Sequence, residues 1–164
     1  MALGKNEDSL FEAQFAQQPP RILIVEDEAV VALHLKRELT NLGYIVAGIA
    51  DDGEQALERL VNEMIDLVLL DIHISGPLDG IETAKRIPKY LHIPVVYLTA
   101  YSEDSTLARA SETNPYGYLI KPFQAREVHS TLKMALARSR SDQAVRENEA
   151  LLLRAACMTS MGHC

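Results

Sequence analysis

The stretch DLVLLDIHISGPLDG, residues 66–80, decides the fold class. Its first five residues, Asp66 to Leu70, predict a strand. Leu67 to Leu70 form a short apolar run of the kind found in parallel strands that are covered on both faces. Asp71 ends this run, and the glycines and proline of residues 76–80 predict a loop. The helical pattern that begins at Ile81 completes a strand–loop–helix unit with a carboxylate at the end of the strand.

The same alternation of strand and helix extends in both directions from this stretch. Further strands are predicted over residues 21–25, 44–50, 93–98 and 116–120. Helices are predicted over 28–42, 56–64, 81–90, 105–113 and from 124 onward, with Pro88 bending or ending the third. Because each connection is long enough for a helix, the pattern predicts an α/β fold with a five-stranded parallel sheet.

Length and composition place limits on the organisation of the chain. Its 164 residues fit one domain with extensions, predicted as a flexible leader at 1–20, a body at 21–140 and a helical extension or linker at 141–164. A net charge of −7 argues against a general nucleic-acid binder. No apolar run reaches the ~18 residues of a membrane span. The absence of a secretory signal pattern and the presence of only two cysteines favour the cytoplasm.

Polar residues follow four of the five predicted strands: Glu26 and Asp27, Asp71, Thr99 and Lys121. Taken singly, Asp27 and Thr99 are ordinary helix caps, Asp71 an ordinary turn residue and Lys121 a solvated surface lysine. The carboxyl ends of parallel strands meet at one edge of the sheet, however, and three carboxylates crowded there repel one another without a cation. Carboxylate oxygens suit Mg²⁺.

Four segments resemble the signature segments of the two-component response-regulator receiver domain: ILIVEDE (22–28), DLVLLDIHISGPLDG (66–80), PVVYLTAY (94–101) and GYLIKPF (117–123). The resemblance covers about residues 21–140. It implies a flavodoxin-like sheet of order 2-1-3-4-5 and a phosphoryl group accepted from a histidine kinase or phosphotransfer protein.

The resemblance also implies a role for each matching residue. Asp71 corresponds to the phospho-acceptor, and Glu26 and Asp27 to the acidic pair that binds Mg²⁺ beside it. The main-chain carbonyl of His73 corresponds to a further metal ligand. The remaining matches are Thr99 and Tyr118 as switch residues, and Lys121 as the cation beside the phosphoryl group, followed by a cis bond to Pro122.

Three features of the matching segments stand out. The acidic pair is Glu-Asp instead of Asp-Asp, so we expect Glu26 to reach the metal through water. The loop from Asp71 to Gly80 is one residue longer than usual. His73 and Tyr101 occupy the positions, two after the acceptor and two after the threonine, that flank the phosphoryl group, and we expect them to limit the access of water.

The C-terminal helix is predicted to run past the body. Val145, Leu152 and Ala156 fall on one narrow stripe, which fits either a solvated tail, a short parallel coiled coil between two receivers, or a connector to a further module. A homodimer through residues 105–113, the strand 116–120 and this helix is therefore a candidate assembly. About two dozen residues after the receiver are too few for a DNA-binding domain, so no direct nucleic-acid contact is expected.

We therefore expect a cytoplasmic, Mg²⁺-dependent phosphoryl-accepting switch that catalyses its own phosphorylation and dephosphorylation and is not a metabolic enzyme. The nearest alternative is a receiver module from a hybrid or multi-domain sensor kinase. A flavodoxin-like cofactor binder would need a Ser/Thr/Gly-rich phosphate loop where Glu26–Glu28 lies. A haloacid-type phosphatase would need an acid at His73.

Overall fold

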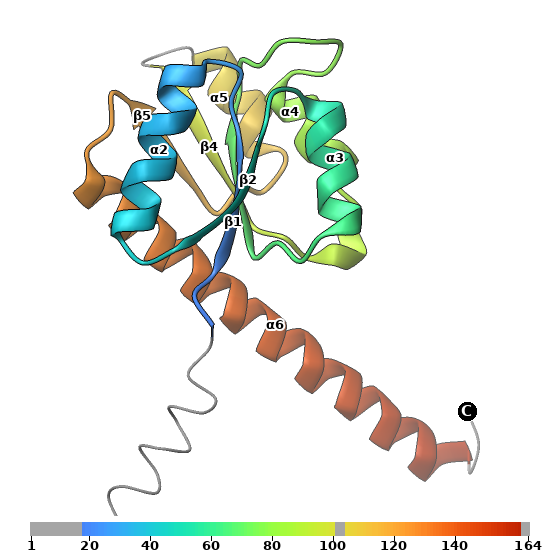
Figure 1. Ribbon diagram of the computed structural model, residues 1–164. Coiled ribbons are helices and arrows are strands. Elements are labelled where there is room, and N and C mark those ends of the chain that lie inside the picture. The colour runs from blue at the N-terminus through green and yellow to red at the C-terminus, as the bar shows by residue number, and fades with distance from the viewer. Residues whose placement is uncertain (1–17, 101–103, 162–164) are drawn as a thin grey trace, which may run out of the picture.

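The computed structural model describes residues 18–100 and 104–161. Five parallel strands form one sheet in the order β2-β1-β3-β4-β5 (Figure 1). The strands are β1 (Arg21–Val25), β2 (Ile45–Ala50), β3 (Leu67–Asp71), β4 (Val95–Ala100) and β5 (Gly117–Lys121). The predicted α/β fold and strand order are confirmed.

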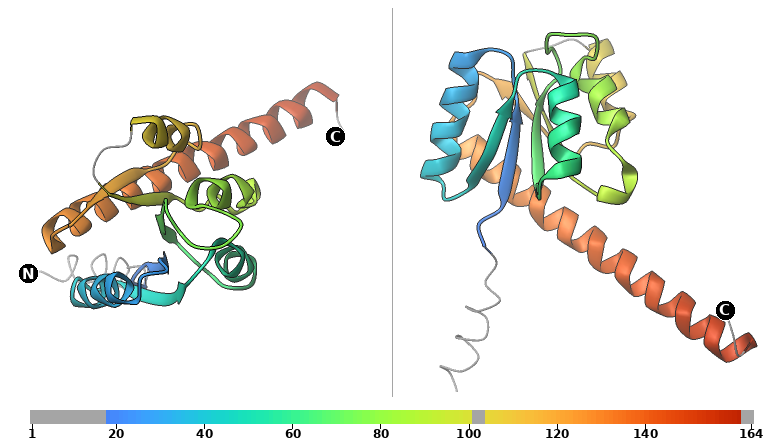
Figure 2. Two further views of the ribbon diagram at one scale, coloured as in Figure 1. Left: turned by 90° about the horizontal axis from the view of Figure 1, so that it is seen from above. Right: turned by 45° about the vertical axis from the view of Figure 1, so that its right-hand side comes forward.

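Helices cover both faces of the sheet (Figure 2). One face carries α2 (Ala29–Asn41) and the first part of α6 (Ala125–Met161), and the other carries α3 (Gly53–Asn62), α4 (Gly80–Arg86) and α5 (Asp104–Ser111). Alternate residues of each strand serve the two faces: Ile22 and Ile24 belong to the core beneath α2 and α6, whereas Leu23 and Val25 belong to the core beneath α3 and α4. Burial on both faces explains the continuous apolar runs of the strands.

Local chemistry shifts two helix boundaries relative to the sequence prediction. The helix predicted over 56–64 begins at Gly53, because the Asp52 side chain accepts a hydrogen bond from the Gln55 amide at 2.9 Å and caps it. The helix predicted over 81–90 ends at Arg86. Ile87 is extended, with ψ 124°, as the following proline favours, and a 3₁₀ turn follows at Lys89–Leu91.

The last helix, α6, has 37 residues and is therefore about 55 Å long. Val128, Leu132 and Leu136 are buried against the sheet, as predicted. The Tyr116 hydroxyl donates a hydrogen bond to Asp142, and the guanidinium of Arg138 lies 4.7 Å from the centre of the Tyr116 ring. These contacts hold α6 to the body, and its remaining part protrudes (Figures 1 and 2).

No helix within the described residues is both long and apolar enough to cross a lipid bilayer.

Candidate functional site

The polar residues that follow the strands meet at one edge of the sheet. Glu26 comes directly after β1, Asp71 is the last residue of β3, and Lys121 is the last residue of β5. Thr99 lies near the end of β4, where its neighbour Ala100 pairs with Lys121. The convergence predicted from the sequence is therefore present in the structure.

An ion-pair centre joins three of these residues. The Lys121 ammonium donates hydrogen bonds to Asp71 Oδ2 at 2.5 Å and to Glu26 Oε2 at 2.9 Å. Glu26 and Asp71 are 1% and 4% exposed, so both carboxylates are removed from bulk water. Lys121 is consequently not a solvated surface lysine: its charge compensates two buried acids.

Burial and charge act in opposite directions on this centre. Burial, together with the neighbouring Asp71, raises the pKa of Glu26 to about 7, although Lys121 and the Glu28 amide oppose the change. For Lys121, burial acts to lower the pKa, but the hydrogen bonds and charges of Asp71 and Glu26 outweigh it and the pKa is raised. The site thus contains an excess of negative charge that one lysine does not fully neutralise.

Asp27 is held by the loop that follows β3. The amide of Ser75 donates to Asp27 Oδ2 at 3.1 Å, and the Ser75 hydroxyl donates to the same oxygen. The hydroxyl hydrogen bond is the main cause of the lowered pKa of Asp27. The helix-cap alternative for Asp27 is wrong, because the N-cap of α2 is Glu28, which makes no side-chain capping bond.

Three carboxylates form a potential cation site. Ligand oxygens of Glu26, Asp27 and Asp71 all lie within 4.8 Å of one another. Two of these residues are buried, and Asp27 is more accessible, which leaves an approach from solvent. An all-oxygen carboxylate set with an uncompensated negative charge fits a hard divalent ion such as Mg²⁺.

The backbone around Asp71 is tightly packed. The His73 amide donates to Asp71 Oδ1 at 2.8 Å, so the turn bond considered as an alternative role does form, alongside the contact with Lys121. The Gly80 amide donates to the Ile72 carbonyl at 2.8 Å and closes the loop. A β-carbon at Gly80 would lie 2.1 Å from the Asp71 carbonyl oxygen, so only glycine fits there.

The two expected switch residues do not touch the ion-pair centre directly. Thr99 is 6% exposed, and its hydroxyl donates to the Ala100 carbonyl at 3.0 Å. Tyr118 is half-buried, stacks on Tyr97 with 6.0 Å between ring centres, and shares a hydrogen bond with Ser111 of α5 at 3.1 Å. Tyr101, expected to cover the phosphoryl group, lies outside the described residues.

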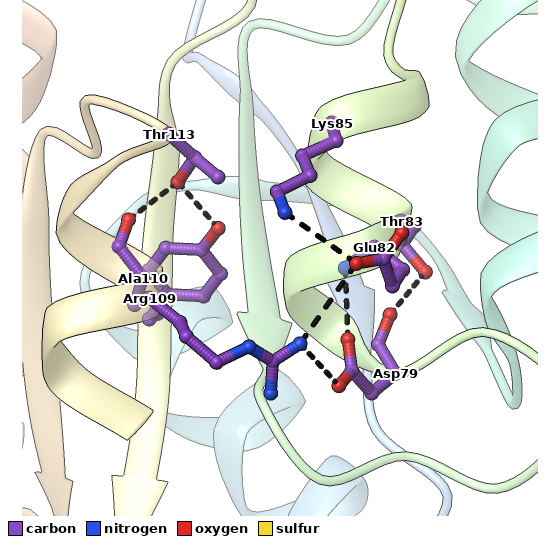
Figure 3. A network of polar contacts seen from close by, with 8 residues as sticks. Asp79, Glu82, Thr83, Lys85, Arg109, Ala110 and Thr113 are labelled. Carbon is purple, nitrogen blue, oxygen red and sulfur yellow. Dashed lines mark hydrogen bonds and ion pairs between the residues drawn. The ribbon is translucent and has the colours of Figure 1, made fainter. Parts of the chain in front are cut away.

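A polar network joins the loop after β3 to α5 (Figure 3). Asp79 caps α4 by accepting from the Glu82 amide at 2.8 Å. The Arg109 guanidinium, on α5, lies 3.2 Å from Asp79 Oδ2 and 3.8 Å from Glu82 Oε1. Neither Arg109 nor Ser75 was predicted from the sequence as a contact of the site. No pattern in the sequence indicates either contact, because both depend on the path of the loop after β3.

The comparisons agree on one family. A family model described as "Response regulator receiver domain" matches residues 22–133. The transcriptional regulatory protein PdtaR of Mycobacterium tuberculosis is 34% identical over 84% of this chain and 66% of its own length. YrkP of Bacillus subtilis is 40% identical over 81% of this chain, and ZraR of Escherichia coli is 41% identical over 73%. The chain spans only 56% of YrkP and 27% of ZraR.

Solved structures show the same relationship. The receiver domain of a modulated diguanylate cyclase from Desulfovibrio desulfuricans matches with a TM-score of 0.72 and 37% identity, covering 76% of this chain and 98% of that domain. NtrX from Brucella abortus also gives a TM-score of 0.72, at 28% identity, covering 78% of this chain and 29% of NtrX. The Lys121–Pro122 peptide bond is cis, as the resemblance implies. The family model, the relatives and the solved structures show that the chain belongs to the response-regulator receiver domain family of two-component signalling.

Proposed function

We propose that Asp71 accepts a phosphoryl group from a histidine kinase or a phosphotransfer protein, in a Mg²⁺-dependent reaction that the receiver itself catalyses. The observation that carries this proposal is the position of Asp71: it is a buried carboxylate bonded to Lys121 and lies beside two further acids. A nucleophilic carboxylate needs cations around it before an anionic phosphoryl donor can approach.

Each residue has a separate task in the proposed transfer. An Asp71 oxygen attacks phosphorus, the bond from phosphorus to the donor nitrogen breaks, and its electron pair stays on the donor histidine. Lys121 neutralises charge on the phosphoryl oxygens as they approach. Glu26, Asp27, Asp71 and the His73 carbonyl would hold Mg²⁺, which supplies further neutralising charge when bound. We expect Asp27→Asn to weaken Mg²⁺ binding more than Glu26→Gln. Both oxygens of Glu26 already accept hydrogen bonds, from Lys121 and the Glu28 amide, whereas Ser75 occupies only one oxygen of Asp27.

Thr99 and Tyr118 would change conformation when Asp71 is phosphorylated. After phosphorylation, the Thr99 hydroxyl would leave the Ala100 carbonyl and donate a hydrogen bond to a phosphoryl oxygen. The Tyr118 ring would then lose its hydrogen bond to Ser111 and move into the space that Thr99 has left. A phosphoryl group adds roughly 1.5 to 2 negative charges, enough to bias such a two-state element. His73 and Tyr101 would limit the access of water to the product.

The setting of this switch is part of the same proposal. Residues 21–140 form the receiver, and 141–164 form a helical extension or linker. The chain works in the cytoplasm, as a response regulator or as a receiver module of a hybrid or multi-domain sensor kinase. Association of two copies through α5, β5 and α6 would couple phosphorylation to assembly.

Intact mass after incubation with acetyl phosphate and Mg²⁺ tests the acceptor assignment. The parent chain should gain one phosphoryl group, and Asp71→Asn and Asp71→Ala should gain none. Asp51→Asn is the matched control, because Asp51 is an exposed aspartate after a strand of the same sheet. Labelling of Asp71→Asn at the parental level would exclude Asp71 as the acceptor.

A further inference from the structure

The protruding part of α6 carries large apolar side chains that are more than half exposed. Val145, Leu151, Leu152 and Met158 are 55%, 62%, 62% and 76% exposed. Their backbone is regular helix up to Met161. A helix without a core of its own gains most of its stability from packing an apolar face against a partner, so these side chains indicate a missing neighbour.

These residues are arranged with a seven-residue period. Positions spaced alternately by three and four along the exposed helix form what we name the seam: Ser141, Ala144, Asn148, Leu151, Ala155 and Met158. Val145 and Leu152 flank it on one side. In coiled-coil terms, Ser141, Asn148 and Ala155 take the a position and the other three take the d position.

We propose that the seam binds the seam of a second copy of this chain, with the two helices parallel. A parallel pair places Asn148 opposite the second copy's Asn148, where the two amides can satisfy one another. A single asparagine at an a position is a known means of fixing register in two-stranded coils. The proposal specifies the dimer contact of the proposed function, and it adds the side chains, the register and the direction.

The antiparallel alternative is less favourable. It would place Asn148 against the second copy's Leu151 and leave each amide without a partner. In return it would bring Glu147 near the second copy's Arg154. Exposed ion pairs of this kind contribute little, whereas a buried unpaired amide is costly. The cost of an unpaired Asn148 amide therefore exceeds the gain from the ion pair, which favours the parallel arrangement.

The contacts at the base of the helix suit this arrangement. Tyr116, immediately before β5, is bonded to Asp142 and packed beneath Arg138. The seam begins at Ser141, so α6 is held to the body where the seam starts. Two helices that leave their receivers in a fixed direction lose less freedom when they pair. The seam spans fewer heptads than a self-sufficient coiled coil needs, so it should reinforce contacts between the receivers.

Sedimentation of the full chain over a range of concentrations tests the contact. Leu151→Asp should weaken dimerisation about tenfold or more, because it buries a charge at the centre of the seam. Leu153→Asp is the matched control: Leu153 is 72% exposed on the same helix but points away from the seam, so its variant should dimerise as the parent does. Equal dimerisation of Leu151→Asp and the parent, or a parent that stays monomeric, would overturn the proposal.

Disulfide trapping tests the direction, in a background where Cys157 and Cys164 are replaced by serine. Met158→Cys should cross-link to itself in a parallel pair. In the antiparallel register it would lie opposite Ser141, about 25 Å along the helix from its counterpart. Cross-linking that appears only when Ser141→Cys and Met158→Cys chains are mixed would exclude the parallel arrangement. Labelling of Leu151→Asp by acetyl phosphate separates the two proposals: loss of dimer with retained labelling leaves the Asp71 assignment intact.

Discussion

Ser75 places two donors, its main-chain amide and its hydroxyl, on one oxygen of Asp27. Ser75 lies in the loop between β3 and α4, and it is also bridged to Asp52, the N-cap residue of α3. The loop therefore orients a carboxylate that follows a different strand. Both Ser75 donors bind Asp27 Oδ2, so we expect Asp27 to use Oδ1 if it binds a cation.

Ser75→Ala should raise the pKa of Asp27 toward its ordinary value. The lowered pKa stabilises the folded state above the pKa of the unfolded chain, and this contribution disappears as the pH falls through the folded pKa. The variant should thus lose roughly 1 kcal/mol or less near neutral pH, the scale of one hydrogen bond, and less in acid. Carboxyl NMR titration measures the pKa directly. Ser139→Ala, on α6, should leave the Asp27 titration unchanged, and an unchanged titration in Ser75→Ala would show that the amide alone controls Asp27.

Glu26→Gln should flatten the pH dependence of stability of the metal-free protein. Glu26 has a folded pKa of about 7 against an ordinary 4.5, so between these values the folded state binds the proton more tightly than the unfolded state does. Stability should therefore fall as the pH rises from 4.5 to 7. Urea unfolding at pH 5.5 and pH 8 in the presence of a chelator measures the slope. If the free energy of unfolding of Glu26→Gln depends on pH as steeply as that of the parent, a group other than Glu26 causes the dependence.

Gly80→Ala should destabilise the protein by about 2–3 kcal/mol and slow phosphorylation. The new β-carbon would meet the Asp71 main chain, which has little room to move within the sheet. Gly48→Ala makes the same change on β2, but the three atoms nearest to its β-carbon would all belong to the flexible end of the Arg59 side chain, not to the main chain. Denaturant unfolding of the two variants should differ by at least about 1 kcal/mol. Similar unfolding free energies for the two variants would show that the 72–80 loop can shift to accommodate the new β-carbon at little cost.

Both the sheet and the polar residues at its edge could be predicted from the sequence. Apolar runs such as Ile22–Val25 are strands because both faces of the sheet are covered, and the residues after them converge because parallel strands end together. The contacts of Ser75 with Asp27 and of Arg109 with Asp79 were not predictable, because they depend on the path of a loop with no periodicity. The end of α4 at Arg86 agrees with the expectation that Pro88 bends or ends this helix, although the helical pattern of the sequence continues to Tyr90.

Ser111→Ala should shift the resting position of Tyr118. The Tyr118 hydroxyl is held by Ser111 of α5 at 3.1 Å, so removal of that partner should favour the inward ring position proposed for the phosphorylated state. Amide spectra with and without beryllofluoride measure the shift. The Ser111→Ala spectrum without beryllofluoride should move part of the way toward the beryllofluoride-bound parent at residues near Tyr118. Ser130→Ala, on α6, is the control, and identical Tyr118 shifts in both variants would argue against the hydrogen bond as a restraint.

Phosphorylated Asp71 should be long-lived for a receiver. Hydrolysis requires water in line with the bond that breaks, on the side away from the Asp71 carboxylate. His73 is exposed two residues after the acceptor, and its amide is bonded to Asp71 Oδ1 at 2.8 Å, so its ring is attached beside the reacting group. Tyr101 follows Thr99 by two residues, and the resemblance implies that it is the second residue that flanks the phosphoryl group. Both rings would exclude water without occupying the phosphoryl position.

Decay of the phosphorylated protein after removal of the donor measures this protection. His73→Asn combined with Tyr101→Glu or Tyr101→Ala should accelerate decay, and each single change should have a smaller effect. The initial rate of labelling by acetyl phosphate separates protection from damage, because a distorted site would accept the phosphoryl group more slowly. His92→Asn is the matched control, since His92 lies in the turn before β4, away from the strand ends that carry the site. An unchanged decay rate in the double variants would mean that neither ring shields the bond.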